Sequence, residues 1–147
     1  MRHFSALITL ALLSVLLCAP AASARTPSGF QRGIHQVTNG VREAHDRAAL
    51  SKRKCVQRFA KKQARRMARQ ERMFHQDLQP VLDTCGLRRA GENVAYGFTS
   101  PQSVMDAWMD SDGHRRNILD KRFRRLGVGA KQSEDGTWYL AQVFGRR

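Results

Sequence analysis

The chain has 147 residues and a formal net charge of +14, from 26 Lys and Arg against 12 Asp and Glu. This length suits one domain of ordinary size rather than two, and the charge excludes an acidic or neutral protein of the cytosolic average. An apolar fraction of 41% is enough to build a core, so the composition does not favour a disordered chain. Most of the basic residues are Arg, whose planar guanidinium binds phosphate and carboxylate groups, so anionic partners are a first hypothesis.

The N-terminus has the pattern of a secretory signal peptide over residues 1–24. Arg2 and His3 give a short positive start, an apolar run covers 6–17, and Ala-Ser-Ala at 22–24 fits the rule of small residues at a cleavage site. The run is too short for a comfortable bilayer span, so we expect a secreted, extracellular protein rather than an integral membrane protein. The alternatives are an uncleaved anchor and a lipoprotein.

Export affects the interpretation of the cysteines. Cys18 would leave with the signal peptide, and the remaining pair, Cys55 and Cys85, is most simply a disulfide in an exported chain. The bond would close a loop of about thirty residues, worth roughly 3.5–4 kcal/mol in the chain-entropy model. A cysteine metal site is not favoured because the sequence has no CxxC, and a catalytic thiol would be prone to oxidation outside the cell.

The predicted elements of the remaining chain run from helices to strands. We expect a short flexible lead over 25–29 and then a single domain over 30–147. The expected elements are helices over 30–44, 54–74 and 101–112, one more helical turn at 114–119, a segment that is part loop and part strand at 91–97, and strands at 126–130 and 137–144 joined by a turn at 134–136. Helices first and strands last favour an α+β fold with an antiparallel sheet over a βαβ array.

Periodicity also predicts which large side chains are buried. Met105, Trp108 and Met109 share one helical face and are expected in the core. Trp138 and Tyr139 are neighbours on a predicted strand and point to opposite faces, so we expect one in the core and the other on the surface.

Three residues are candidates for chemistry: His75, Glu92 and His114. Each lies just beyond a predicted helix or in a Gly-flanked loop, where functional side chains are often held. Two imidazoles and one carboxylate suffice for a metal with an open coordination position, and they equally suit general acid–base chemistry near neutral pH. The structural alternative is that Glu92 caps a backbone turn and the histidines hydrogen-bond to it. His35 and His45 lack any motif and receive no role.

Five short motifs surround these candidates. They are Met-Phe-His-Gln-Asp-Leu at 73–78, Gly-Glu-Asn-Val-Ala-Tyr-Gly at 91–97, Ala-Trp-Met-Asp-Ser-Asp-Gly-His-Arg-Arg-Asn-Ile-Leu at 107–119, Gly-Val-Gly at 127–129 and Trp-Tyr-Leu-Ala-Gln-Val-Phe-Gly at 138–145. Together and in this order, they resemble the CAP superfamily, also called SCP-like or cysteine-rich secretory, antigen 5 and pathogenesis-related-1 domains. The match is to its small exported bacterial branch and covers nearly all of the chain beyond the signal peptide.

The resemblance implies an α-β-α sandwich, in which a small antiparallel sheet lies between helical layers. It also implies a cleft that carries two histidines and two acidic residues. By motif, His75 and His114 match the two histidines, which bind zinc or another divalent metal in some members, and Glu92 matches the first acid.

The chain departs from the family pattern at the second acid. Ser111 stands at that position, and Asp110 and Asp112 flank it without aligning, so they are weak candidates for the missing carboxylate. Asn93 and Tyr96 are expected to hold the loop that carries the first acid.

Three functions follow as hypotheses. The first is an extracellular binding module whose cleft takes a lipid, sterol or peptide. The second is a metal-dependent, peptidase-like hydrolase with Glu92 as the base, against which the missing second acid weighs. The third is a cationic protein that adheres to anionic cell-wall polymers through Arg-rich faces at 52–72 and 115–125. Nucleic acid is not favoured, because no aromatic interleaving accompanies the charge, and we expect a monomer.

Overall fold

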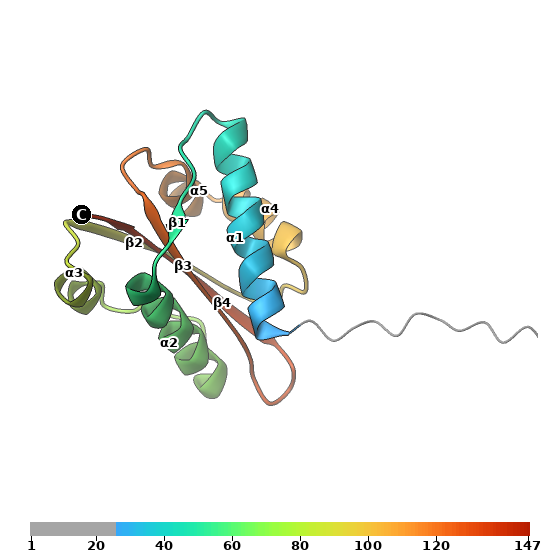
Figure 1. The fold of residues 1–147 in the computed structure, drawn as a ribbon. Helices are drawn as coiled ribbons and strands as arrows, with labels where there is room; N and C mark the ends of the chain where they lie inside the picture. Colours follow the sequence, from blue (N-terminus) through green and yellow to red (C-terminus); the bar gives the residue numbers. More distant parts are fainter. Residues whose placement is uncertain (1–25) are drawn as a thin grey trace, which may run out of the picture.

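The computed structural model of the chain describes residues 26–147, so the predicted signal peptide lies outside the described residues. The elements in chain order are α1 (Pro27–Ala44), β1 (Ser51–Lys52), α2 (Lys54–Gln70), α3 (Gln79–Cys85), β2 (Arg89–Tyr96), α4 (Pro101–Asp110), α5 (Asp112–Leu119), β3 (Arg125–Gln132) and β4 (Trp138–Arg146). The strands form one sheet in the order β1-β3-β4-β2, with helices on both faces (Figure 1). The α+β class and the sandwich architecture are confirmed.

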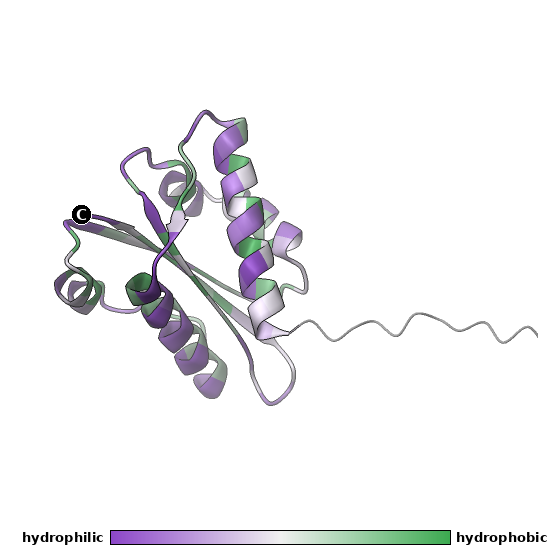
Figure 2. Cartoon of the chain, in the orientation of Figure 1, coloured by the Kyte–Doolittle hydropathy of each residue, from purple (hydrophilic) through white to green (hydrophobic). Residues whose placement is uncertain are grey.

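Each face of the sheet has its own apolar layer. On one face, α1, α4 and α5 pack through a core that includes Phe30, Trp108 and Leu140. On the other face, α2 and α3 pack through smaller clusters that include Val56 and Val143. The helices show hydrophobic patches beside hydrophilic ones, as expected for helices that cover a sheet (Figure 2). In residues 26–147, no helix combines the length and apolarity that a bilayer span requires.

The sheet is mixed rather than purely antiparallel. β4 pairs antiparallel with both β2 and β3, as expected, but the two-residue strand β1 pairs parallel with β3. The sequence predicted no strand here, because two residues are too few to show a periodic pattern. The β3–β4 hairpin turn is confirmed, with Gly136 in the left-handed region at φ 85°.

Several element ends differ from the prediction. Helix α1 begins at Pro27, because the Thr26 side chain accepts a hydrogen bond from the amide of Gly29, so most of the predicted lead is helical. Helix α2 ends at Gln70 rather than at 74, since Glu71 adopts a left-handed conformation. The break between α4 and α5 lies at Ser111, where the backbone is extended, and Gly113 is inside α5.

The prediction for the Trp138 and Tyr139 pair was wrong. Both side chains are buried, because helices cover both faces of the sheet and neither face is left to solvent. Trp138 meets the ring of Phe30 on α1 edge to face, whereas Tyr139 packs with Met67 of α2.

The layer of α2 and α3 is held by close packing and by a covalent bond. A Cβ atom added at Gly127 or Gly129 would overlap the α2 backbone, so β3 approaches α2 where only a hydrogen fits. The predicted disulfide is confirmed: Cys55 at the start of α2 is bonded to Cys85 at the end of α3, with a Cα–Cα distance of 5.7 Å.

Candidate functional site

The three predicted residues come from three different elements. His75 lies in the segment between α2 and α3, Glu92 on β2, and His114 on α5. Residues 91–96 belong to a continuous strand, so Glu92 is not on a loop, and His114 is inside a helix rather than after one. Because β2 ends the strand order, the site lies at an open edge of the sheet.

The Glu92 carboxylate is buried and serves as an acceptor for three donors. Its side chain is 2% exposed. Oε1 accepts from His75 Nδ1 at 2.9 Å and from the amide of Gln76 at 3.0 Å, while Oε2 accepts from the Gln76 side chain. The carboxylate therefore caps the backbone at Gln76, as the structural alternative expected, and also orients one imidazole.

The segment that carries His75 is fixed from α2. The buried Gln63 side chain donates to the carbonyl oxygen of Phe74, and the Phe74 ring packs on the cluster that contains Val94 and Tyr139. The side chain of His75 remains 61% exposed. Since Nδ1–H donates to Glu92, the neutral ring carries its free lone pair on Nε2.

His114 is positioned by the residue that follows Glu92. The Asn93 side chain points to the opposite face of β2 and donates to the carbonyl oxygen of His114 at 3.2 Å and to Gln142 Oε1 at 3.0 Å. Asn117, also on α5, donates to Asn93 Oδ1 and to the carbonyl oxygen of Glu92. This network ties α5 to the edge strand, a role that sequence reasoning assigned to Asn93 in a loop and did not assign to Asn117.

The electrostatics keep His114 neutral. Burial lowers the pKa of its imidazole below the ordinary value of 6.5, and the positive charge that His75 can carry lowers it further. The Nδ1 atom of His114 is buried and has no hydrogen-bond partner among the described residues.

The candidates for a second acid do not join the site. Asp112 pairs with the Arg115 guanidinium, and Asp110 is exposed at the end of α4. Ser111 forms the break between the two helices. Glu92 is therefore the site's acid, and both of its oxygens are already occupied.

The donor set fits a metal only in part. A catalytic zinc site takes three protein ligands, and here two imidazoles are available while Glu92 is engaged by other donors. Within residues 26–147, no group of three or more His, Cys, Asp and Glu side chains is arranged to hold a metal ion.

Exposed apolar side chains accompany the polar residues. Met73 is 45% and Tyr96 54% exposed, and they are the exposed large hydrophobic residues of the described chain. The Tyr96 ring stacks on Tyr139, so Tyr96 adjoins the apolar cluster, and Met73 precedes Phe74 in the chain. Tyr96 lies on the same strand face as Glu92, rather than holding a loop.

Comparison with known proteins relates this arrangement to a family. The family model described as "CAP: Cysteine-rich secretory protein family" matches residues 35–144. The uncharacterized protein YkwD of Bacillus subtilis is 29% identical over 126 residues, which cover 81% of this chain and 48% of that protein. The crystal structure of an extracellular protein containing a SCP domain from Bacillus anthracis is similar with a TM-score of 0.72 and 26% identity, covering 82% of this chain and 41% of that one.

A third similarity shows the fold alone. An outer surface protein of Borrelia burgdorferi has a TM-score of 0.71 at 17% identity, covering 78% of this chain and 90% of that one. The chain spans less than half the length of the two Bacillus proteins. The matched family model covers all three candidate residues and most of the described fold. This chain therefore belongs to the CAP family, the cysteine-rich secretory proteins.

Proposed function

We propose that this chain is an extracellular CAP binding module that holds a small amphipathic, lipid-like ligand at the open edge of β2. The observation that carries the proposal is the buried Glu92 carboxylate, which accepts three hydrogen bonds and orients the exposed ring of His75. The similarity to an extracellular protein containing a SCP domain supports the extracellular setting.

The polar half of the site favours a hydroxyl head group. His75 Nε2 offers a lone pair, because Nδ1 donates to Glu92. His114 is held neutral by burial, so its ring offers one N–H and one lone pair rather than a charge. A hydroxyl can donate to one imidazole and accept from the other, whereas a carboxylate can only accept.

The apolar half of the site favours a hydrocarbon chain or ring system. Tyr96 is exposed and stacks on Tyr139 of the apolar cluster, Met73 is exposed two residues before His75, and covering both side chains would remove apolar surface from water. Ligand sites of this kind combine apolar contact area with a few oriented polar groups.

The geometry supports the hydrolase hypothesis less well than it supports a binding module. A general base must lie within reach of the attacking water, and the Glu92 side chain is only 2% exposed and already accepts three hydrogen bonds from His75 and Gln76. Zinc binding by the two imidazoles stays a prediction, with the remaining coordination positions left to other ligands. Titration of Zn²⁺ against His75→Ala and His114→Ala tests it, and equally poor binding by all three proteins would dismiss it.

The experiment for the proposed ligand uses octanol, with octanoate as the anion of matched length. We expect the protein to bind octanol more tightly than octanoate in a calorimetric titration. His75→Ala and His114→Ala should each weaken octanol binding by about fivefold to tenfold, which is the loss of one hydrogen bond. Tyr96→Ala should weaken both ligands, since it removes apolar contact.

The matched control is His45→Ala, which removes an exposed histidine at the end of α1. Its octanol affinity should equal that of the unchanged protein. Equal affinity for octanol in all of the histidine variants would contradict the proposed site, and preferred binding of octanoate would contradict the hydroxyl head group.

A further inference from the structure

Three Arg–Arg pairs meet at one end of the sheet. They occupy 88–89, 124–125 and 146–147, at the beginning of β2, the beginning of β3 and the end of β4. In the strand register Arg89 lies opposite Arg146, and Arg125 lies opposite Gly145. Each pair has one member in a strand and the other just beyond the end of that strand.

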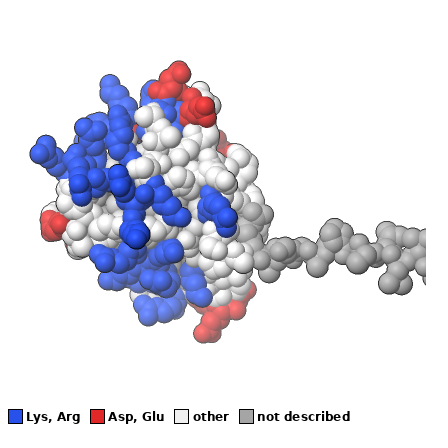
Figure 3. Space-filling model, viewed as in Figure 1, with Lys and Arg blue, Asp and Glu red and all other residues white. Residues whose placement is uncertain are grey.

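Neighbouring segments enlarge this group, which we call the basic end. Its members are Lys52, Arg53, Lys54, Arg88, Arg89, Lys121, Arg122, Arg124, Arg125, Arg146 and Arg147. Lys and Arg gather on the side of the molecule where the C-terminus lies (Figures 1 and 3). The sequence predicted separate faces at 52–72 and 115–125, whereas the fold joins parts of both with the C-terminus.

The basic end is hollowed. A hollow of about 490 Å³ lies beside the disulfide, and its charged lining consists of Lys52, Arg53, Lys54, Arg125 and Arg147. A second hollow of about 530 Å³ is lined entirely by seven Lys and Arg residues, and it shares Arg147 with the first. The shared residue makes the two hollows neighbours, so an extended anion could lie across both.

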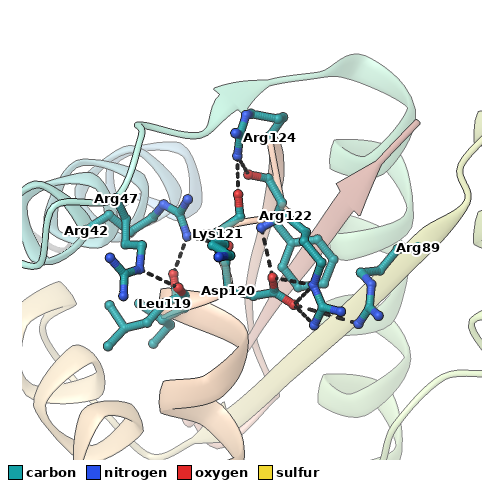
Figure 4. A network of polar contacts seen from close by, with 10 residues as sticks. Arg42, Arg47, Arg89, Leu119, Asp120, Lys121, Arg122 and Arg124 are labelled. Carbon is teal, nitrogen blue, oxygen red and sulfur yellow. Dashed lines mark hydrogen bonds and ion pairs between the residues drawn. The ribbon is translucent and has the colours of Figure 1, made fainter.

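Little negative charge offsets these cations. No acid among the described residues lines either hollow, and the nearby Asp120 carboxylate is bonded by Arg122 and lies 3.7 Å from Arg89 (Figure 4). Burial, together with the charges of Arg147 and Arg53, lowers the pKa of the Arg125 guanidinium. Like charges placed directly opposite on a ladder destabilise a sheet, so the facing pair Arg89 and Arg146 does not itself favour folding.

The surroundings distinguish between kinds of anionic partner. The exposed large apolar residues of the described chain, Met73 and Tyr96, belong to other segments, so no apolar side chain at the basic end could enter a bilayer. No aromatic residue lines either hollow, so stacking on nucleic-acid bases has no platform there. Arginine forks match phosphate groups without either feature.

We propose that the basic end is a binding site for an extended phosphodiester polymer that lacks bases and acyl chains. The guanidinium groups of the three Arg pairs hold successive phosphates along the two hollows. This site is separate from the His75–His114 site and does not depend on its function.

The test compares two variants that lose the same charge. Lys54→Gln/Arg88→Gln/Arg147→Gln removes three exposed cations of the basic end. The control, Arg32→Gln/Arg69→Gln/Lys131→Gln, removes three exposed cations elsewhere. The probe is poly(glycerol phosphate), titrated into the purified protein at about 50 mM and about 200 mM salt.

We expect the first variant to bind the polymer at least about tenfold more weakly, with a shallower salt dependence, and the control to stay within about twofold of the unchanged protein. Equal losses in both variants would show attraction to net charge alone and would overturn the proposal. Tighter binding of single-stranded DNA or of anionic lipid vesicles than of the polymer would overturn the choice of partner. Circular dichroism confirms that both variants fold.

Discussion

Glu92 acts on the site through another residue. Its carboxylate accepts from His75 Nδ1 and from two donors of Gln76, so it fixes the tautomer and direction of the imidazole while remaining buried. A ligand at the edge of β2 would therefore meet His75 rather than Glu92. This makes Glu92 a positioning residue.

The variant Glu92→Gln tests that role. The new amide group has no negative charge, so it loses the charge-assisted hydrogen bonds from His75 and Gln76. We expect a loss of about 1–3 kcal/mol in the free energy of unfolding, measured by urea denaturation, together with weaker octanol binding. Glu43→Gln, at an exposed position of α1, is the control and should change neither quantity. Full stability and affinity in Glu92→Gln would contradict the positioning role.

The stability of the protein should fall on mild acidification. Burial lowers the pKa of the imidazoles of both His114 and His35 below 6.5. The unfolded chain therefore takes up these protons at higher pH than the folded chain does. The free energy of unfolding should decrease as pH falls from 6.5 through the lowered pKa values.

Denaturant titrations over a pH series measure this dependence. His114→Gln should flatten the decrease, because the substituted side chain takes up no proton in this range. A decrease of unchanged size in that variant would show that His114 is not the titrating group.

The sequence predicted the residues of the candidate site better than the residues that hold them in place. Motif matching identified His75, Glu92 and His114, because each lies in a short recognisable segment. It did not identify Gln63, whose contact with the Phe74 carbonyl depends on where α2 ends. Asn117 had a signal, since it lies in the same motif as His114, but its bond to Asn93 follows only from the packing of α5 on β2.

Helix α2 packs so closely on strand β3 that Gly129 has no room for a side chain. Gly129→Ala would place a Cβ atom against the carbonyl of Ala60, where neither backbone can yield cheaply. We expect a loss of about 3 kcal/mol or more in the free energy of unfolding, measured by denaturant titration.

Gly40→Ala is the matched control for this substitution. Gly40 is an exposed residue of α1, and nothing lies within 4 Å of an added Cβ atom. Alanine should raise the free energy of unfolding there by about 0.5–1 kcal/mol, because glycine is a poor helix former. Equal effects of the two substitutions would contradict the close packing of α2 on β3.

Periodicity predicted the long elements and failed at short ones. The start of α4 was predicted from Ser100 and Pro101, and the Ser100 side chain does cap the helix. Strand β1 was missed because its two residues carry no pattern, and its pairing with β3 is a tertiary contact. The end of α2 was placed too late because apolar residues continue past Glu71, where the chain leaves the helix.

At the scale of the whole molecule, the disulfide between Cys55 and Cys85 links α2 covalently to α3. Replacing Cys55 and Cys85 together by Ala should lower the free energy of unfolding by about 3–4 kcal/mol, since the bond closes a loop with a sequence separation of 30 residues. Thermal unfolding followed by circular dichroism measures the loss, and reduction of the unchanged protein should reproduce it. Unfolding that is insensitive to reduction would contradict the bond.

The edge strand β2 contributes residues to both proposed binding sites, the basic end and the site beside His75. The Arg89 end of β2 faces the basic end, whereas Glu92 and Tyr96 lie farther along, beside His75. The sequence showed an excess of positive charge but could not show where it gathers, because strand register brings residues 88–89 beside 146–147.

The most direct test of the histidine site is an NMR titration of the imidazole nitrogens with octanol. The account predicts that the ring resonances of His75 and His114 shift together, with one binding constant, while those of His45 stay unchanged. Shifts that are absent at His75 and His114, or as large at His45, would contradict the site at the edge of β2.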